Sequence, residues 1–313
     1  MLKILLTGSQ GQVGSSIRAL VSNHNNKIEN IKLFACSRAD CDIADRTAVN
    51  NIFNKIQPDV VINAAAYTAV DKAEEDVEQA EKINVYAVEN LALACQKLNI
   101  PMLHISTDYV FDGTQSLPYA YQETDETNPL GIYGKTKLAG EKKLQESCEK
   151  FIVLRTSWVF SEYGNNFVKT MLKLFKQKET LSIVSDQYGG PTSADAIAKA
   201  LLIIAKKVTE KELDLNQNKN LWGVYHFAGQ PVVNWCEFAT KISELDSSER
   251  KIIKNILPIT AAKFGAKAPR PMNSALDISK IKQVFNIDVC DWQQDVLKII
   301  NLSTERCQTP VCG

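Results

Sequence analysis

A glycine-rich turn close to the first residue limits the possible folds more than any other feature of the chain. An apolar run at residues 3–7 passes directly into Gly8, Gly11 and Gly14, and an amphipathic helical pattern at 13–22 follows. Glycines at this spacing allow a tight turn, let backbone amides approach a pyrophosphate, and bring the helix close to the strand. The start of the helix also attracts an anion. The turn therefore predicts a strand–helix unit that binds a dinucleotide through Gly8, Gly11, Gln12, Val13 and Gly14.

The alternation of strands and helices continues through the first half of the chain. Apolar runs recur and alternate with helical patterns at 13–22, 46–55, 77–98 and 133–147. The runs lie at residues 3–7, 32–36, 60–63, 102–106 and 152–156. They are apolar on both faces, as strands of a parallel sheet covered by helices require. The pattern predicts an α/β fold with a Rossmann-type, doubly wound parallel sheet.

After about residue 160 the alternation becomes less regular. The expected elements are helices at 166–176 and 194–206, a polar solvated connection at 207–220, and short strands and helices from 222 to 302. We expect a dinucleotide-binding domain at 1–165, with 193–225 packing back onto it. The remaining expected parts are a smaller C-terminal α/β lobe that binds the substrate, made of 166–192 and 226–302, and a mobile tail at 303–313.

Composition and charge disfavour several classes of partner. Hydrophobic residues make up 45% of the chain and charged residues 23%, as in an ordinary globular protein, and the formal net charge is zero. Zero net charge gives no reason to expect a nucleic acid or an anionic membrane as a partner. The N-terminal apolar run is too short for a signal peptide, and no run approaches the length of a membrane span. We therefore expect a cytoplasmic protein.

The end of the second predicted strand bears on the choice of dinucleotide. A carboxylate there would hold the ribose 2′-hydroxyl of NADH, whereas an arginine accommodates the 2′-phosphate of NADPH. Ser37 and Arg38 occupy this position, and Asp40 and Asp42 follow a few residues later. We therefore expect the domain at 1–165 to bind NADP(H), with NADH as the alternative donor. The competing interpretation is that Arg38 is an ordinary surface residue.

Two further segments are expected beside the cofactor. Asp42 and Ile43 would lie near the adenine. The strand at 60–63 is followed by Ala64, Ala65 and Ala66. Small residues at the carboxyl end of a strand leave room for a cofactor, although they could equally be small for packing.

Tyr133 and Lys137 form the candidate proton-transfer pair. Their four-residue spacing places both on one face of the helix predicted at 133–147, where the ammonium can favour the phenolate and make Tyr133 a usable acid. The strand at 102–106 delivers Thr107, whose hydroxyl can bind the same carbonyl oxygen. Beside a nicotinamide these side chains suit carbonyl reduction, with hydride going to carbon and a proton to oxygen. His104 lies within that strand and is expected to be a core residue.

With these residues the chain resembles the extended short-chain dehydrogenases/reductases, whose pattern pairs a Ser or Thr with Tyr-x-x-x-Lys. Several blocks, in order, resemble the dTDP-4-dehydrorhamnose reductase family: STDYVFDG at 106–113, NPL and YGKTKLAGE within 128–141, RTSWVF at 155–160, NNF at 165–167, DQYGGPT at 186–192 and RPMNSALD at 270–277. The likeness extends to about Leu302. It implies an NAD(P)H-dependent reduction of the 4-keto group of dTDP-4-dehydro-L-rhamnose. That reaction is the last step of dTDP-L-rhamnose synthesis for cell-surface polysaccharide such as the lipopolysaccharide O-antigen.

The resemblance also implies roles for individual residues. Tyr133 would protonate the developing 4-alkoxide, Lys137 would lower the pKa of Tyr133 and hold the nicotinamide ribose, and Thr107 would hydrogen-bond the substrate oxygen. Asp108 and Trp158 match positions that contact the substrate. Trp158 could instead pack in the core between the two lobes.

Arg270 is a further candidate for substrate binding. It lies between Pro269 and Pro271, which present it rigidly, and a guanidinium suits a substrate diphosphate. We infer this role from chemistry alone. A structural salt bridge is the competing interpretation.

The family resemblance raises the question of a metal ion and a dimer. Family members are known as dimers with an acidic, magnesium-binding contact near the start of the first helix. Here that helix begins with Ser15 and Ser16, so no carboxylate supports Mg²⁺ and no metal site is predicted. A homodimer stays an open expectation.

Two other functions remain open. A sugar-nucleotide epimerase would keep its cofactor bound through turnover, and a noncatalytic NADP-binding subunit would regulate another enzyme. Thr107 and Trp158 favour the reductase over the regulatory subunit. A 4,6-dehydratase is disfavoured because Thr107 is followed by Asp108 and Tyr109, which lack the second acid.

Overall fold

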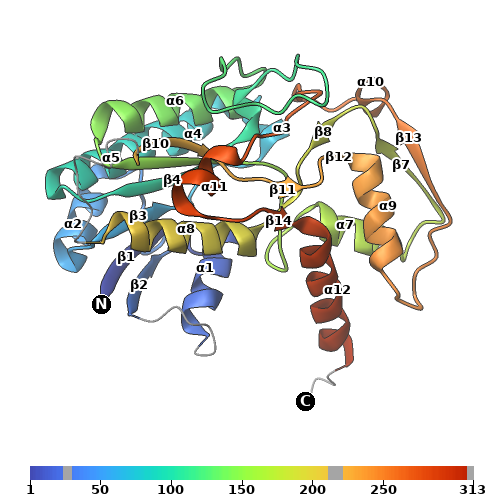
Figure 1. The fold of residues 1–313 in the computed structure, drawn as a ribbon, viewed down its shortest axis with the longest axis horizontal. Helices are drawn as coiled ribbons and strands as arrows, with labels where there is room; N and C mark the ends of the chain where they lie inside the picture. Colours follow the sequence, from blue (N-terminus) through green and yellow to red (C-terminus); the bar gives the residue numbers. More distant parts are fainter. Residues whose placement is uncertain (24–29, 211–220, 309–313) are drawn as a thin grey trace.

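A six-stranded parallel sheet is the centre of the larger part of the molecule (Figure 1). The computed structural model describes residues 1–23, 30–210 and 221–308, with side chains as far as residue 302. The strands lie in the order β10-β5-β4-β3-β1-β2, with bounds β1 (Leu2–Thr7), β2 (Ile31–Cys36), β3 (Val60–Asn63), β4 (Met102–Thr107), β5 (Phe151–Thr156) and β10 (Gly223–His226). The predicted α/β fold with a doubly wound parallel sheet is confirmed, and the five predicted strands are confirmed to within one residue.

The strand order reverses direction at the centre of this sheet. From β1 the chain passes to β2 at one edge, and β3, β4 and β5 then follow on the other side of β1. In sheets of this kind ligands bind outside the carboxyl ends of the strands, at the point where the order reverses. Thr7, Asn63 and Thr107 end three of these strands, so they mark the edge where a site is expected.

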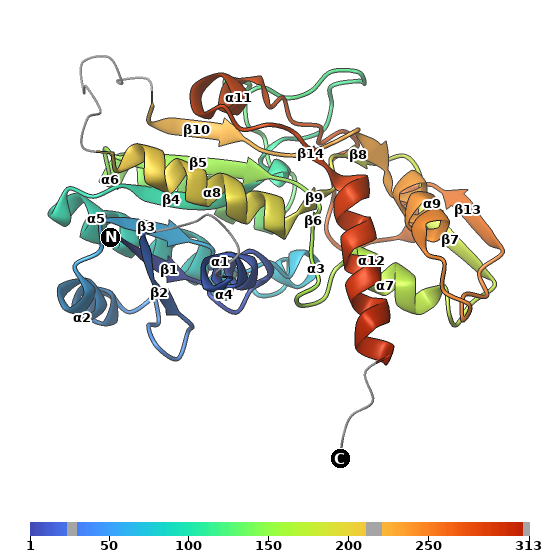
Figure 2. The same cartoon turned by 60° about the horizontal axis from the view of Figure 1, so that its bottom comes forward.

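Helices cover both faces of the sheet (Figure 2). One face carries α1 (Gln12–Ser22), α8 (Ala194–Val208) and α11 (Ser279–Phe285), whose apolar residues share a core with β1, β3 and β5. The other face carries α2 (Arg46–Ile56), α5 (Ala87–Leu98) and α6 (Ile132–Ser147). Capping side chains fix where some helices begin. The Asp45 carboxylate accepts from the backbone of Thr47 and Ala48 at the start of α2, and the Ser193 hydroxyl does so from Ala196 at the start of α8.

The helix predicted at 77–98 is not continuous. It comprises α4 (Val77–Glu81), a π-helical turn η1 (Lys82–Tyr86), and α5. Asn84 in this turn accepts from the backbone N–H of Tyr67 at 2.9 Å and donates to the Tyr67 carbonyl and to the Thr136 hydroxyl. Tyr67 lies on the segment after β3 and Thr136 lies on α6. The π-turn inserts an extra residue into the helix, and this turns the Asn84 side chain toward these two partners. Its position therefore depends on tertiary contacts that helical periodicity does not contain.

A second, smaller lobe packs beyond the carboxyl ends of the strands. Its core includes Phe160, Phe175, Phe238 and Trp292. Its helices are α7 (Phe167–Leu174), α9 (Trp235–Leu245), α10 (Ala261–Phe264) and α12 (Trp292–Gln308), and its longer strands, β7 (Thr180–Val184) and β13 (Asn255–Ile259), pair in parallel. Short strand pairs border the lobe: β6 (Val159–Phe160) with β9 (Thr192–Ser193), β8 (Tyr188–Gly189) with β12 (Val233–Asn234), and β11 (Gly229–Gln230) with β14 (Cys290–Asp291).

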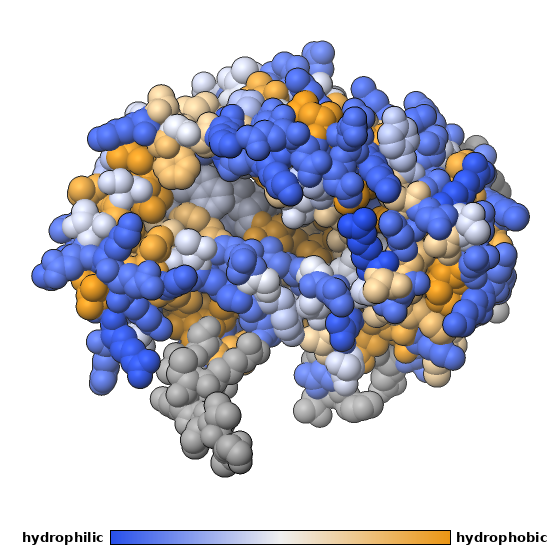
Figure 3. Space-filling view, turned by 180° about the vertical axis from the view of Figure 1, so that it is seen from behind, coloured by the Kyte–Doolittle hydropathy of each residue, from blue (hydrophilic) through white to orange (hydrophobic). Residues whose placement is uncertain are grey.

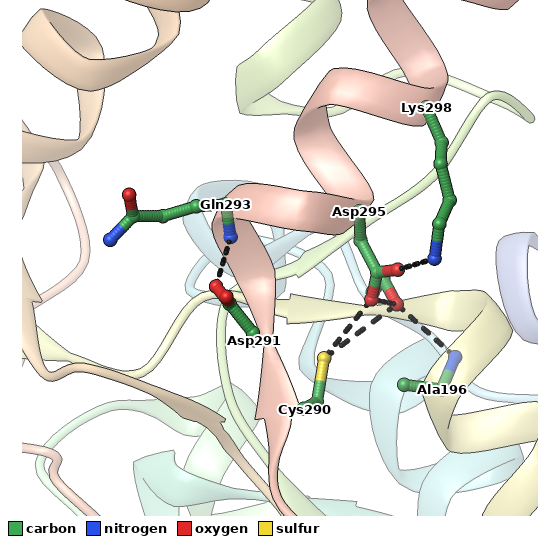
Figure 4. A network of polar contacts seen from close by, with 7 residues as sticks. Ala196, Cys290, Asp291, Gln293, Asp295 and Lys298 are labelled. Carbon is green, nitrogen blue, oxygen red and sulfur yellow. Dashed lines mark hydrogen bonds and ion pairs between the residues drawn. The ribbon is translucent and has the colours of Figure 1, made fainter.

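A polar cluster holds the two parts together where α8 and α12 begin (Figure 4). The Ser193 hydroxyl and the Cys290 thiol both donate to Asp295, and Lys298 forms an ion pair with the same carboxylate at 2.8 Å. Burial raises the pKa of the Cys290 thiol to about 12, so this cysteine stays a thiol. The cluster therefore fixes the orientation of α12 against the sheet domain.

The last helix reaches into the segment expected to be a tail. Helix α12 continues to Gln308, so residues 303–308 have helical backbone, and the mobility of the tail stays a prediction. The apolar stripe of Val296, Ile299 and Ile300 anchors the helix, and no proline interrupts it before Pro310. Residues 309–313 of the expected tail, and 211–220 of the expected polar connection, lie outside the described residues. Among the helices that are described, none combines the length and the apolar character that a membrane span requires.

Candidate active site

Most of the predicted site residues line a cavity of about 500 Å³ at the carboxyl edge of the sheet. The molecule is hollowed in the middle of the face seen in Figure 3, between the sheet domain and the second lobe. The cavity is lined from three directions: the glycine turn, the ends of β3 and β4 with the start of α6, and the second lobe. The lining includes Gln12, Val13, Ala65, Thr107, Tyr133, Lys137, Trp158 and Trp235.

The glycine turn packs as the spacing predicts. Gly8 has a φ of +67°, and a Cβ built on it would lie 2.4 Å from the backbone nitrogen of Ala65. A Cβ on Gly14 would lie 2.2 Å from the carbonyl oxygen of Gly8. Neither position accepts a side chain, because backbone atoms occupy the space. The turn therefore brings the start of α1, with Gly11 and Val13, to the cavity wall.

The positions of the three alanines after β3 fit both interpretations that the sequence left open. Ala64, Ala65 and Ala66 all line the cavity. The backbone of Ala64 and Ala65 also lies against Gly8, where a larger residue would disturb the turn. The same small side chains therefore allow the close packing of the turn and leave space in the cavity.

The residues expected at the adenosine end of a cofactor are not part of the cavity wall. The Ser37 amide and hydroxyl both donate to the Asp40 carboxylate, at 2.8 and 2.7 Å. The Arg38 side chain is 71% exposed and approaches Asp42 at 3.8 Å. Ile43 is buried in the core beneath α2 and α5. All four predicted residues lie next to the end of β2 but outside the lining of the cavity.

Thr107 and Tyr133 lie together in the cavity. Thr107 ends β4, Tyr133 lies in the first turn of α6, and their side chains are hydrogen-bonded. Burial raises the pKa of Tyr133 to about 12, and the bond with Thr107 partly opposes this. Burial is the largest influence on this pKa, and the Lys137 amine is hydrogen-bonded to other groups, so the expected lowering of the Tyr133 pKa by Lys137 stays a prediction.

Lys137 is buried and turned toward β4. Its Nζ donates to the Ile105 carbonyl at 2.7 Å and lies 3.2 Å from Nε2 of His104. Burial lowers the pKa of Lys137 to about 8, and the nearby Glu141 carboxylate raises it in part. Arg155 binds that carboxylate in a buried ion pair of 2.7 Å. His104 is fully buried, as expected of a core residue, but it also contacts the lysine.

Asp108 is a buried carboxylate in the cavity wall. Its Oδ1 accepts from the Thr107 hydroxyl at 3.0 Å. Burial raises the pKa of Asp108 to about 6. Its position beside Thr107 places it where a substrate hydroxyl could be recognised.

Trp158 and Trp235 form the wall on the side of the second lobe. Their rings stack with centroids 3.5 Å apart and an interplanar angle of 6°. Trp158 has a φ of +46°, and a Cβ on Gly189 would lie 2.6 Å from its ring. The stack is held between Gly189 and α9, so Trp158 both packs between the lobes and lines the cavity. Sequence reasoning missed Trp235, although the capping box of Asn234 and Glu237 marks the helix that carries it.

Arg270 forms the salt bridge that was the competing interpretation. Its guanidinium pairs with Asp71 at 2.8 Å and donates to the Ala268 carbonyl at 3.0 Å. Arg270 is not in the cavity wall. A hydrogen bond joins it to Tyr109, and Tyr109 lines the cavity. Its role toward a diphosphate therefore stays a prediction. The described residues contain no cluster of histidine, cysteine and acidic side chains able to hold a metal ion.

Comparison with known proteins gives consistent matches over nearly the whole chain. A protein-family model described as the RmlD substrate binding domain matches residues 2–304. The chain is 43% identical over 302 residues to a dTDP-4-dehydrorhamnose reductase of Aggregatibacter actinomycetemcomitans, covering 96% of this chain and 98% of that protein.

Solved structures agree with these sequence matches. A dTDP-4-dehydrorhamnose reductase structure from Clostridium acetobutylicum is similar with a TM-score of 0.83 and 36% identity, over 97% of this chain and 100% of that one. A reductase of the same name from Bacillus anthracis, in complex with NADP, has a TM-score of 0.83 and 31% identity, over 96% and 100% of the two chains.

Proposed function

The chain belongs to the family of dTDP-4-dehydrorhamnose reductases, and we propose that it reduces the 4-keto group of dTDP-4-dehydro-L-rhamnose with NADPH to form dTDP-L-rhamnose. NADH is the alternative donor. The observation that carries the proposal is the meeting of Thr107, Tyr133 and Lys137 with the glycine turn in one cavity.

The glycine turn fits a dinucleotide. Side chains are excluded at Gly8 and Gly14, so the backbone of the turn and the start of α1 can approach a pyrophosphate. Gly11, Gln12 and Val13 line the same cavity as Tyr133. When bound, the nicotinamide supplies the hydride.

Tyr133 is the proposed proton donor. Its raised pKa keeps the phenol protonated until negative charge develops on the substrate oxygen. The hydrogen bond with Thr107 orients the phenol, and Thr107 can bind the same oxygen. Lys137 in its ammonium form would favour the phenolate that results.

The second lobe would hold the nucleotide sugar. Asp108 and Trp158 both line the cavity, where the carboxylate could contact sugar hydroxyls and the indole could contact the apolar side of a sugar. Arg270 would need to share its guanidinium between Asp71 and a diphosphate. A homodimer and a cytoplasmic location stay predictions.

A coupled assay tests the proposed function. Purified protein is supplied with dTDP-4-keto-6-deoxyglucose, the 3,5-epimerase and NADPH, and loss of NADPH absorbance is followed. We expect consumption that depends on the epimerase. Absence of consumption with both NADPH and NADH would contradict the proposal. Tightly bound NAD together with a product epimerised but not reduced would indicate the epimerase instead.

A further inference from the structure

A chain of buried polar side chains crosses three strands and ends at Lys137. Thr7, Asn63 and His104 occupy paired positions on β1, β3 and β4. The Thr7 hydroxyl donates to Oδ1 of Asn63 at 2.7 Å, and Nδ2 of Asn63 lies 3.0 Å from Nδ1 of His104. Nε2 of His104 lies 3.2 Å from Nζ of Lys137. None of the four is more than 2% exposed.

The backbone of Ala65 fixes the direction of the hydrogen bonds. Its N–H, which can only donate, lies 3.1 Å from Oδ1 of Asn63. This contact determines the orientation of the Asn63 amide, because the reverse orientation would oppose two N–H groups. Nδ2 of Asn63 must therefore donate to Nδ1 of His104. Burial keeps the pKa of His104 well below its ordinary value, so the ring is neutral and carries its hydrogen on Nε2.

This tautomer places an N–H group against Lys137. A neutral amine has a lone pair that can accept from Nε2–H, whereas an ammonium has none and would oppose one N–H with another. The Ile105 carbonyl accepts from either form of the lysine at 2.7 Å. The two protonation states thus differ in whether the contact with His104 is a hydrogen bond.

The other ionisable groups around Lys137 do not remove this difference. Glu141, on the same helix, favours the ammonium, but its carboxylate is already paired with Arg155. The remaining ionisable side chains at this end of the cavity are Asp108, Tyr109 and Tyr133.

We propose that His104 is a positioning residue that presents N–H to Lys137, favours the neutral amine over the ammonium, and so sets the alkaline limit of the reduction. The proposal rests on the proposed function only for its effect on turnover. The ammonium is the form that stabilises the Tyr133 phenolate, so turnover declines once Lys137 loses its proton.

The tautomer is tested directly by NMR of protein labelled with ¹⁵N-histidine. The H104F variant identifies the His104 signals by their loss. We expect a neutral ring protonated on Nε2 at every pH at which the protein is folded. A ring protonated on Nδ1, or an imidazolium near neutral pH, would overturn the proposal whether or not the protein is active.

The effect on Lys137 is tested with Asn63→Asp, which has the same shape but only accepts. The introduced carboxylate can only accept, so the His104 ring must change tautomer. Its hydrogen then lies on Nδ1 and bonds to the carboxylate, and the lone pair of Nε2 faces Lys137. We expect the alkaline limb of kcat/KM to move upward by about one pH unit or more. The added negative charge would by itself also move the alkaline limb to higher pH. The same substitution is therefore made in the H104F background.

The double-variant comparison separates the two causes. A smaller upward shift for Asn63→Asp in the H104F background than in the wild-type background supports the role of His104. An equal shift in both backgrounds would assign the effect to charge and overturn the proposal. A reduced kcat with an unmoved alkaline limb in both N63D and H104F would show a merely structural histidine. Failure of the wild-type protein to reduce the sugar would instead contradict the proposed function and leave the NMR result standing.

Discussion

Replacing Asp108 by Asn is expected to make the protein more stable and less active. The pKa of this carboxyl is raised from 3.8 to about 6 by burial, so the folded protein holds its proton more tightly than the unfolded chain does. The native state therefore binds more protons between these two pH values, and the free energy of unfolding falls as the pH rises through this interval. Above about pH 6 the cost of burying the ionised group is fully present.

The size of the effect follows from the two pKa values. A difference of about two units corresponds to about 3 kcal/mol at pH 8, and to about half of that at pH 5. The introduced amide would carry no charge and could still accept from the Thr107 hydroxyl, so D108N should gain about this much at pH 8 and nothing below pH 4. Urea unfolding of both proteins at several pH values measures the difference.

In a matched control, Asp112→Asn, the change in the free energy of unfolding should have the opposite sign. Asp112 accepts from the backbone of Thr114, and its pKa is lowered, so D112N should be less stable than the wild type at neutral pH. If D108N were no more stable at pH 8 than at pH 4 relative to wild type, the raised pKa would be wrong. D108N should also lower kcat/KM about 10- to 100-fold, as loss of a charged hydrogen bond to substrate would. Unchanged kcat/KM would remove Asp108 from the substrate site.

Three further results are expected. Tyr133→Phe should lower kcat by about 10²- to 10⁴-fold and leave the Kd of NADPH nearly unchanged, because it removes one proton donor and little volume. Tyr109→Phe, which removes the neighbouring hydroxyl, is the control. Near-normal turnover of Y133F would exclude Tyr133 as the acid. Arg38→Ala should weaken NADPH more than NADH in binding titrations, since its exposed guanidinium is available to a 2′-phosphate; equal weakening would leave no basis for that role. Arg155→Met should lower the free energy of unfolding by about 3–5 kcal/mol, because it leaves Glu141 charged and buried. Adding Glu141→Leu should recover much of this loss. A single variant as stable as the wild type would show that the pair is not coupled.

Local patterns predicted most of the fold. The strands are apolar on both faces and the helices are amphipathic, and these properties can be recognised within a few residues. β10 was not expected as a strand of the main sheet, because it is four residues long and far in sequence from its neighbour β5. The π-turn at Asn84 was not expected either, since its cause is a set of contacts with Tyr67 and Thr136.

The same distinction separates the parts of the site. Gly8 and Gly11 are three residues apart, and Tyr133 and Lys137 are four apart, so their geometry depends on one turn or one helix. The polar chain from Thr7 to His104 depends instead on the register of three strands, which no short pattern encodes. The stack of Trp158 on Trp235 and the pairing of Arg270 with Asp71 likewise join residues from distant segments.

The path of the chain between the lobes limits how this enzyme can be recombined with its relatives. After the first segment of the second lobe, the chain returns to supply α8, which packs on α1, and β10, which completes the sheet. A chimaera with a single crossover near residue 165 would therefore carry foreign α8 and β10 into the dinucleotide-binding part. Exchange of the substrate lobe as an intact unit needs crossovers on both sides of each of its two segments. Recombination can therefore transfer substrate specificity only when both segments, before α8 and after β10, are exchanged together.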